Sequence, residues 1–376
     1  MAATSVPTSP SSSAIVLRNG GLATLVVLAL AGAICAAFKP HVLRTWVGFC
    51  FMAATPAQLI LSVLWQTNHP PAIARLAQPR KGFLLTAATV FAACVIGPLM
   101  FYLGGAGVGP PTPMLLMLTT TTIIATIWLV DVWDCWPISM VTSNRTVLGI
   151  TTLVVAYATA FLVFNLLFDF SFLAHTPLYV ASLDPKGQLN AWIAISLLAT
   201  TGAVIVVFMA FDFWPVSALI RSRRQPAFGL ANTILILAAS TLLYLFFTRL
   251  VGLDPVQHLV RVAVSLMYGI LLVQIMTRRQ LLDGWRQPLR GLGLTAIAGV
   301  LALLMYGLYA ASASAFAQQA VPAGPPAYEL EMWVATAMLG ITFPLMIVVA
   351  GFFELWPLHR RPPAGITAPQ RGEADH

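Results

Sequence analysis

Long apolar runs separated by short polar segments dominate the hydropathy pattern of the chain. A helix needs about 20 apolar residues to cross the hydrocarbon core of a bilayer, and ten runs of about that length are present. They lie near residues 20–38, 42–65, 83–104, 113–136, 147–172, 189–214, 228–251, 257–277, 291–314 and 330–356. None alternates apolar and polar residues as a membrane β-strand does. The pattern predicts an all-α membrane protein with about ten transmembrane helices.

The composition supports this prediction. Hydrophobic residues make up 59% of the 376 residues and charged residues only 9%, whereas soluble domains carry about 25% charged residues. The lipid bilayer is therefore the expected partner of most of the surface. The net charge of +8 is spread over the loops without an aromatic-interleaved basic stripe, which indicates no nucleic-acid partner. Abundant Arg, Ala and Pro with only three lysines suggest a high-GC bacterium, and hence a bacterial inner membrane.

Basic residues concentrate at one set of helix ends. Fifteen of the twenty precede the first run or follow an even-numbered run. The other five lie at the opposite ends of the runs: Lys39, Arg44, Lys186, Arg249 and Arg261. Short loops rich in Lys and Arg stay in the cytoplasm. This bias predicts that the N-terminus and the C-terminus are both cytoplasmic.

A fixed spacing of tryptophans suggests internal repetition. One tryptophan ends each even run, and the five are spaced 71, 78, 71 and 71 residues apart: Trp65, Trp136, Trp214, Trp285 and Trp356. Three odd runs begin with Gln-Pro-x-x-Gly, at Gln78, Gln225 and Gln287. Each mark alone is ordinary at a membrane interface, but their common register predicts five parallel two-helix hairpin repeats of about 71 residues.

The predicted organisation is one polytopic membrane domain over residues 18–360. Its hairpins cover residues 18–70, 78–137, 145–215, 225–288 and 287–357. We expect residues 1–17 and 361–376 to be disordered cytoplasmic termini, since they are polar and rich in Ser or Pro.

Acidic residues stand two positions before four of the five tryptophans. They are Asp134, Asp212, Asp283 and Glu354. A carboxylate at a helix C-terminus opposes the helix dipole at a cost of about 0.3–1 kcal/mol, so arginines that follow, such as Arg224, are expected to offset it. One interpretation is a ring of ion pairs that joins neighbouring hairpins. The other is a cytoplasmic collar that forms a channel mouth or docks a partner.

Hydroxyl groups supply most of the polarity inside the predicted spans. Thr122, Thr200 and Thr342 each lie fourteen residues before a repeat tryptophan, and therefore at one expected depth. Such residues often pack helices and bond their own backbone. The alternative is that they line the path of a ligand.

No catalytic signature accompanies these features. The four cysteines and six histidines show no metal-ligand spacing, and no phosphate-binding loop or nucleophile motif is present. The sequence predicts no metal site, no cofactor and no catalytic residue, and it favours a non-enzymatic role.

Two functions lead, and a membrane enzyme is a third alternative that the missing catalytic signature disfavours. Ten spans, internal duplication and hydroxyls without deeply buried charge favour a permease-like protein that handles a small neutral or lipophilic solute. Short loops and the acidic collar suit equally well a membrane-embedded subunit or anchor, without activity of its own, for other membrane or cytoplasmic subunits. Co-purification of a ligand or of partner subunits distinguishes the two.

Overall fold

The computed structural model describes residues 12–176, 179–220, 223–325 and 327–358. Within them, ten helices are long and apolar enough to cross a membrane, as the sequence predicts. Spans 1 to 10 are Ile15–Ala37, Pro40–Leu64, Arg80–Leu103, Pro113–Val132, Arg145–Leu167, Ala191–Ala210, Ala227–Leu250, Pro255–Met276, Leu289–Ala317 and Glu329–Phe352. The chain is a multi-pass membrane protein. The predicted disordered C-terminus lies outside the described residues, as do residues 1–11 of the predicted N-terminal one. Helix α1 already begins at Ser12.

Each span consists of one or more consecutive elements, some of them π-helical (η). In chain order these are α1 (Ser12–Ala37); α2 (Pro40–Val42), η1 (Leu43–Val47), α3 (Gly48–Leu59) and η2 (Ile60–Leu64); α5 (Arg80–Leu103); α6 (Pro113–Ile127) and η3 (Trp128–Val132); α8 (Arg145–Leu167); α9 (Ala191–Ala210); α11 (Ala227–Leu245) and η6 (Phe246–Leu250); α12 (Pro255–His258), η7 (Leu259–Val264) and α13 (Ser265–Met276); α14 (Leu289–Ala317); and α15 (Glu329–Ala335), η8 (Thr336–Thr342), α16 (Phe343–Met346) and η9 (Ile347–Phe352). Between spans lie α4 (Pro71–Ala74), α7 (Ile138–Val141), α10 (Val216–Leu219), the 3₁₀ turns η4 (Ser171–Leu173) and η5 (Ala181–Leu183), and the strands β1 (Phe168–Asp169) and β2 (Leu189–Asn190).

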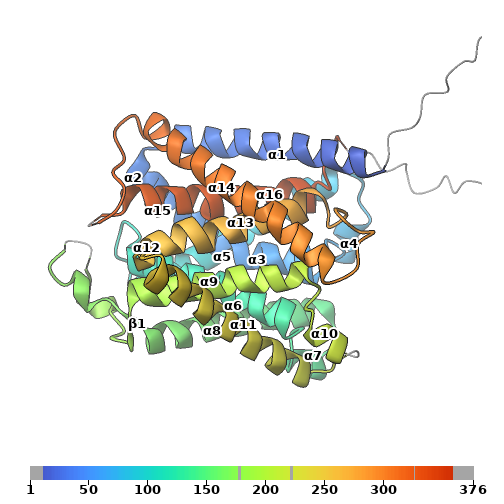
Figure 1. The fold of residues 1–376 in the computed structure, drawn as a ribbon, viewed down its shortest axis with the longest axis horizontal. Helices are drawn as coiled ribbons and strands as arrows, with labels where there is room; N and C mark the ends of the chain where they lie inside the picture. Colours follow the sequence, from blue (N-terminus) through green and yellow to red (C-terminus); the bar gives the residue numbers. More distant parts are fainter. Residues whose placement is uncertain (1–11, 177–178, 221–222, 326, 359–376) are drawn as a thin grey trace, which may run out of the picture.

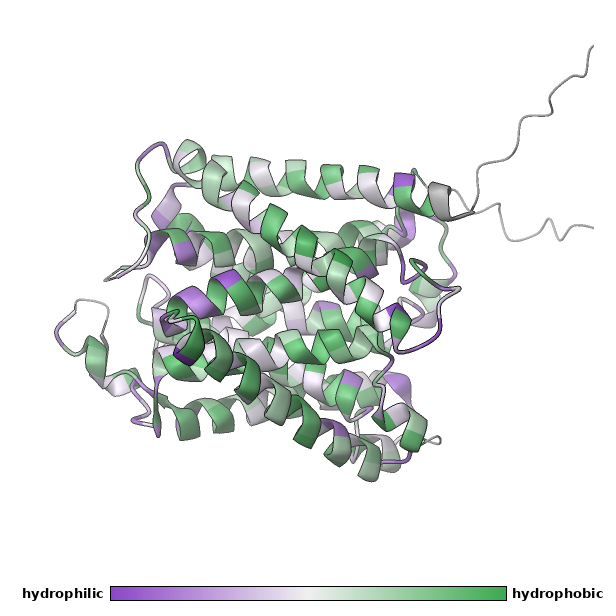
Figure 2. Ribbon diagram, viewed as in Figure 1, coloured by the Kyte–Doolittle hydropathy of each residue, from purple (hydrophilic) through white to green (hydrophobic). Residues whose placement is uncertain are grey.

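The spans run side by side between two ends of the bundle. Helix α1 begins at one end, where α4, α7 and α10 also lie; we call this the proximal end (Figure 1). Strand β1 and helix α12 lie at the opposite, distal end (Figure 1). Hydrophilic residues gather mostly at these two ends, and hydrophobic residues cover the spans between them (Figure 2).

The five even-numbered spans form the interior of the bundle. Span 2 contacts span 4, span 4 contacts span 6, span 6 contacts span 8, span 8 contacts span 10, and span 10 returns to span 2. In the most apolar part of each, between 61% and 78% of the residues are buried. The even spans therefore make a closed ring.

The five odd-numbered spans surround this ring. Each odd span packs against two neighbouring even spans of the ring: span 3 against spans 2 and 10, span 5 against 4 and 2, span 7 against 6 and 4, span 9 against 8 and 6, and span 1 against 10 and 8. The contacting elements are, in the same order, α5 with α3 and η9, α8 with α6 and η2, α11 with α9 and η3, α14 with α13 and α9, and α1 with α16 and α13. Only 22% to 28% of the residues in their most apolar parts are buried. Their large exposed side chains, such as Phe91 and Leu303, suit contact with acyl chains.

The distal end of span 5 departs from the sequence prediction. We expected a helix to residue 172, but α8 ends at Leu167 and the chain enters β1, which pairs in parallel with β2. Phe168 and Phe170 are fully buried there. Asp184 accepts a hydrogen bond from the Phe170 N–H at 3.1 Å. The chain buries these two rings instead of continuing the helix by another turn.

Candidate functional site

Every even span ends at the proximal end in the same backbone turn. Two successive residues adopt a left-handed conformation with φ between 48° and 63°: Gln66 and Thr67, Asp134 and Cys135, Asp212 and Phe213, Arg278 and Arg279, and Glu354 and Leu355. The N–H of the next residue then returns to a carbonyl three residues earlier, as from Trp136 to Trp133 at 2.8 Å. The turn satisfies carbonyls that a helix end leaves unpaired. It also ends spans 4, 6 and 10 four residues before the predicted boundaries.

The turns do not follow the tryptophan spacing throughout. Three tryptophans directly follow a turn: Trp136, Trp214 and Trp356. In spans 2 and 8 that position belongs to Asn68 and Gln280. Among the predicted collar acids, Asp134, Asp212 and Glu354 are the first left-handed residue of a turn. Asp283 lies beyond the turn of span 8, where Arg278 has the equivalent position.

The glutamine of each Gln-Pro-x-x-Gly sequence joins an odd span to one of these turns. The side-chain amide of Gln78 donates to the Phe352 carbonyl at 2.8 Å, that of Gln225 to Val132 at 3.2 Å, and that of Gln287 to Ala210 at 3.1 Å. Each glutamine oxygen accepts the N–H of the glycine four residues later, with N–O distances of 3.2, 2.9 and 3.0 Å. One side chain thus supplies a hydrogen-bond acceptor to a backbone N–H at the start of one helix and a donor to a backbone carbonyl at the end of another.

The glycine of the same sequence makes room for the ring that precedes the turn. A Cβ atom at Gly82, Gly229 or Gly291 would lie under 3.0 Å from the ring of Phe353, Trp133 or Phe211, respectively. Gly149 stands in the same relation to Trp65, whose indole N–H donates to the Arg145 carbonyl at 2.7 Å. We call each of these four contacts a latch. In a latch, an odd-span glycine packs against an aromatic ring of an even span, and the glutamine of the same sequence, or the Trp65 indole, forms a hydrogen bond between the two spans.

Ion pairs reinforce two latches. Lys81 Nζ lies 2.9 Å from Glu354 Oε1, with the two side chains only 9% and 16% exposed. Arg290 lies 3.5 Å from Asp212 and 2.7 Å from Asp283, whose side chains are 52% and 57% exposed. Glu354, Asp212 and Asp283 therefore pair with bases at the start of odd spans. Arg290 follows Asp283 by seven residues, as expected of an arginine that offsets an acid. Of the other arginines that follow the acids, Arg221, Arg360 and Arg361 lie outside the described residues.

Asp134 and Arg224 are placed differently. Both are exposed at the proximal end. Within the described residues, neither takes part in an ion pair. Arg223, which precedes Arg224 in the chain, places its guanidinium carbon 5.7 Å from the centroid of the Phe228 ring.

The three predicted hydroxyls are fully buried and bond to their own helices. Thr122 donates to the Thr119 carbonyl at 2.7 Å and Thr200 to the Ser196 carbonyl at 2.7 Å. Thr342 donates to Ala337 at 2.6 Å, five residues back in a π-helical turn, and its oxygen also lies 2.6 Å from the Tyr309 hydroxyl. These contacts place the hydroxyls in helix packing, and a role in a ligand path stays a prediction.

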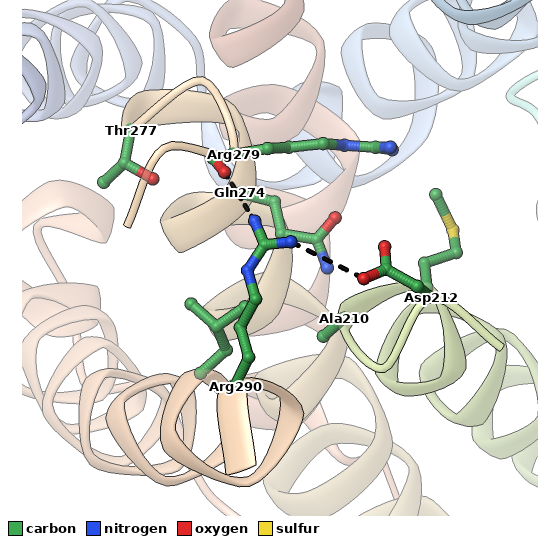
Figure 3. A pocket seen from close by; sticks show the side chains of 8 residues that line it. Ala210, Asp212, Gln274, Thr277, Arg279 and Arg290 are labelled. Carbon is green, nitrogen blue, oxygen red and sulfur yellow. Dashed lines mark hydrogen bonds and ion pairs between the residues drawn. The ribbon is translucent and has the colours of Figure 1, made fainter. Parts of the chain in front are cut away.

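A pocket of about 150 Å³ lies at the proximal ends of α9 and α13, beside α14 (Figure 3). It is lined by Met209, Ala210, Asp212, Gln274, Thr277, Arg279, Arg290 and Leu294. The Arg290 guanidinium reaches Asp212 on one side and the Arg279 carbonyl, at 2.8 Å, on the other (Figure 3). The Arg279 charge acts in turn on Asp131 of span 4.

Two buried ionisable residues that the sequence pattern did not predict as site candidates lie near the distal end. Glu331 is fully buried at the start of span 10, accepts the Gly324 N–H at 3.1 Å, and lies 3.6 Å from Arg261. His258 is also fully buried, and its Nδ1 lies 2.9 Å from the Ser196 hydroxyl. The acid in the first turn of α15 was the available signal for Glu331, because carboxylates are stabilised there.

Comparison of the chain with protein-family models, with curated proteins and with solved structures finds no match. Across the described residues, no three His, Cys, Asp or Glu side chains gather where they could hold a metal ion.

Proposed function

We propose that the chain is a permease-like protein of the bacterial inner membrane, built from five parallel two-helix repeats, with its proximal end and both termini in the cytoplasm. The bias of Lys and Arg toward that end supports the orientation. The recurring turn, the latches and the packing of each odd span against two even spans support the repeats.

The observation that carries the transport proposal is the pocket between α9, α13 and α14, in which a few polar groups lie among mainly apolar walls. It brings an amide, a hydroxyl, a carboxylate and two guanidinium groups to the proximal end of the interior spans. Ligand sites between helices commonly combine apolar walls with a few such polar groups. Met209 and Leu294 supply apolar wall here, and Gln274 supplies an amide oriented by its bond to the Val206 carbonyl at 3.3 Å.

Charge balance favours a neutral solute. Arg290 already contacts Asp212 and Asp283. An ionic solute would have to displace one of these partners, which leaves a charge unpaired in a poorly solvated place. A small neutral molecule that donates and accepts hydrogen bonds meets no such penalty.

Solute flux into proteoliposomes tests the proposal. Stopped-flow light scattering follows vesicle volume after mixing with gradients of small amides, polyols and alcohols. We expect at least one solute to enter faster than into protein-free vesicles, and Gln274→Leu to slow its entry. Gln257→Leu, at the distal end in α12, is the matched control and should leave the rate unchanged. Equal rates with and without protein for every solute would contradict the proposal.

The anchor function is favoured by a different observation, the exposed Asp134 and Arg224. Neither is used in an internal ion pair of the described residues, so both are accessible to a cytoplasmic subunit at the proximal end. Purification in mild detergent tests it. A stoichiometric subunit that co-purifies with the wild type and is lost from Asp134→Asn/Arg224→Gln would replace the transport proposal.

A further inference from the structure

The contact between span 8 and span 1 is the fifth of its kind and lacks the latch. Gly20 of α1 again lies against the end of an even span, where an added Cβ would be 2.8 Å from the Met276 carbonyl oxygen. Val16 occupies the position of the latch glutamine, four residues before the glycine. Thr277 replaces the aromatic ring, and Arg278 stands where three other turns carry an acid.

A pocket opens where these groups are missing. It has a volume of about 50 Å³ and is lined by Ile15, Val16 and Asn19 of α1, by Met276, Thr277, Arg278 and Gln280, and by Leu355. One part of its lining is aliphatic and the other donates hydrogen bonds. The adjacent turn residue, Arg279, lines the larger pocket on the other side of the turn.

The basic side of this pocket carries positive charge that has no ion-pair partner among the described residues. Arg278 is partly buried, and no ion pair within the described residues involves Arg278 or Arg18. Arg18 Nε instead lies 3.4 Å from Asn19 Oδ1, beside the pocket. A guanidinium group binds phosphate oxygens through two parallel hydrogen bonds.

We propose that this junction binds an anionic phospholipid, with the phosphate against Arg278 and Asn19 and an acyl chain along the exposed Leu22 and Leu25 of α1. This apolar surface favours a lipid over a soluble anion, since a free phosphate gains nothing from it. Leu22 and Leu25 continue an exposed apolar surface along α1 toward the middle of the bilayer. Basic pockets between helices near a membrane surface recognise anionic headgroups in this way.

Thermal unfolding of the delipidated full-length protein tests the site. Dioleoylphosphatidylglycerol should raise the unfolding temperature by about 4 °C near saturation. Dioleoylphosphatidylcholine, with the same acyl chains, and inorganic phosphate should each raise it much less. Native mass spectrometry should show one retained phosphatidylglycerol per protein.

Substitution of Arg278 locates the site. Asn adopts left-handed φ readily, so Arg278→Asn keeps the turn and should lower phosphatidylglycerol affinity about tenfold, as expected for loss of a charge-assisted hydrogen bond. Arg223→Asn is the matched control, because Arg223 also has positive φ, at 46°, and lies at the same end of the bundle. Val16→Gln restores the latch glutamine and should weaken lipid binding while leaving Arg278 in place.

Three results would each overturn the proposal. Equal loss of affinity in Arg278→Asn and Arg223→Asn would show general surface attraction. An equal shift with inorganic phosphate would show an adventitious ion only. If Arg278→Asn does not fold, undiminished lipid binding by Val16→Gln would exclude the site.

Discussion

Lys81 and Glu354 form an ion pair of 2.9 Å although 273 residues separate them in the chain. Lys81 lies in the first turn of span 3, and Glu354 lies two residues after the end of span 10. Their pair and the Gln78 bond to Phe352 hold span 3 against the end of span 10. Because span 3 also packs against span 2, these side chains reinforce the place where spans 10 and 2 close the interior ring.

Because this pair is almost buried, the loss of one partner should be strongly destabilising. Lys81→Met should lower the free energy of unfolding by about 3 kcal/mol, since it removes a positive charge 2.9 Å from the nearly buried Glu354 carboxylate. Lys81→Met/Glu354→Leu should recover most of that loss. Thermal or denaturant unfolding of the purified protein measures both. Asp283→Asn is the control: its partner Arg290 is retained and its side chain is 57% exposed, so the change should stay below about 1 kcal/mol. A double variant no better than the single one would show that the pair is not coupled.

The latch glycines predict a position-specific effect of one methyl group. Gly291→Ala brings its Cβ into the Phe211 ring and should cost about 1–3 kcal/mol of stability through overpacking. Gly299→Ala lies on the same helix with nothing within 4 Å, and it should be neutral or slightly stabilising because Ala favours helix. Unfolding measurements that rank the two variants in the opposite order would contradict the packing described.

The buried threonines should contribute modestly and unequally. Thr200→Val removes a back-bond within one helix, so it should change stability by less than about 1 kcal/mol. Thr122→Val also removes a hydroxyl that contacts Tyr157. Because Tyr157 keeps the Ala53 carbonyl as a partner at 3.3 Å, this change should cost about 1 kcal/mol. Thr342→Val also leaves the Tyr309 hydroxyl without its partner in the next helix and should cost about 1–3 kcal/mol. Solute flux in the same variants tests the ligand-path interpretation, which requires a reduced rate in a protein that folds normally.

Membrane orientation can be measured with a matched pair of exposed serines. Ser139 lies in α7 at the proximal end, and Ser182 lies in η5 between spans 5 and 6. In intact cells, an impermeant maleimide should label Ser182→Cys from outside and spare Ser139→Cys until the membrane is opened. Native Cys135 is buried, and burial raises the pKa of its thiol, so it should react slowly in either case. Labelling of Ser139→Cys alone in intact cells would reverse the proposed orientation.

Hydropathy was sufficient for the ten spans because the period and length of an apolar run determine a membrane helix directly. The turns were harder to place. Left-handed residues end spans 4 and 6 at Asp134 and Asp212, which are ordinary polar residues in the sequence, and only φ distinguishes them. Trp65 illustrates the same limit. Its spacing suggested a position equal to Trp136, but its ring lies before the turn and packs on Gly149.

The candidate site required long-range contacts that no local pattern contains. Gln287 was visible as part of Gln-Pro-x-x-Gly, but its partner Ala210 lies 77 residues earlier in another hairpin. The acids were recognised because a carboxylate at a helix C-terminus needs compensation. Glu354 pairs with Lys81 and not with an arginine near it in the chain because of the order in which the spans pack around the ring. Helical periodicity does not determine that order.

Cross-linking between the ends of spans 10 and 3 tests most directly whether span 3 bridges spans 10 and 2, where the interior ring closes. Cysteines at positions 81 and 354, in a variant with both Lys81→Cys and Glu354→Cys, should be joined by a short rigid bismaleimide, and mass spectrometry should recover the linked peptides. Lys81→Cys with Asp212→Cys is the control, since Asp212 holds the same turn position as Glu354 in another span. We expect efficient linkage in the first variant and little in the second. Equal linkage in both, or linkage only in the control, would contradict the ring.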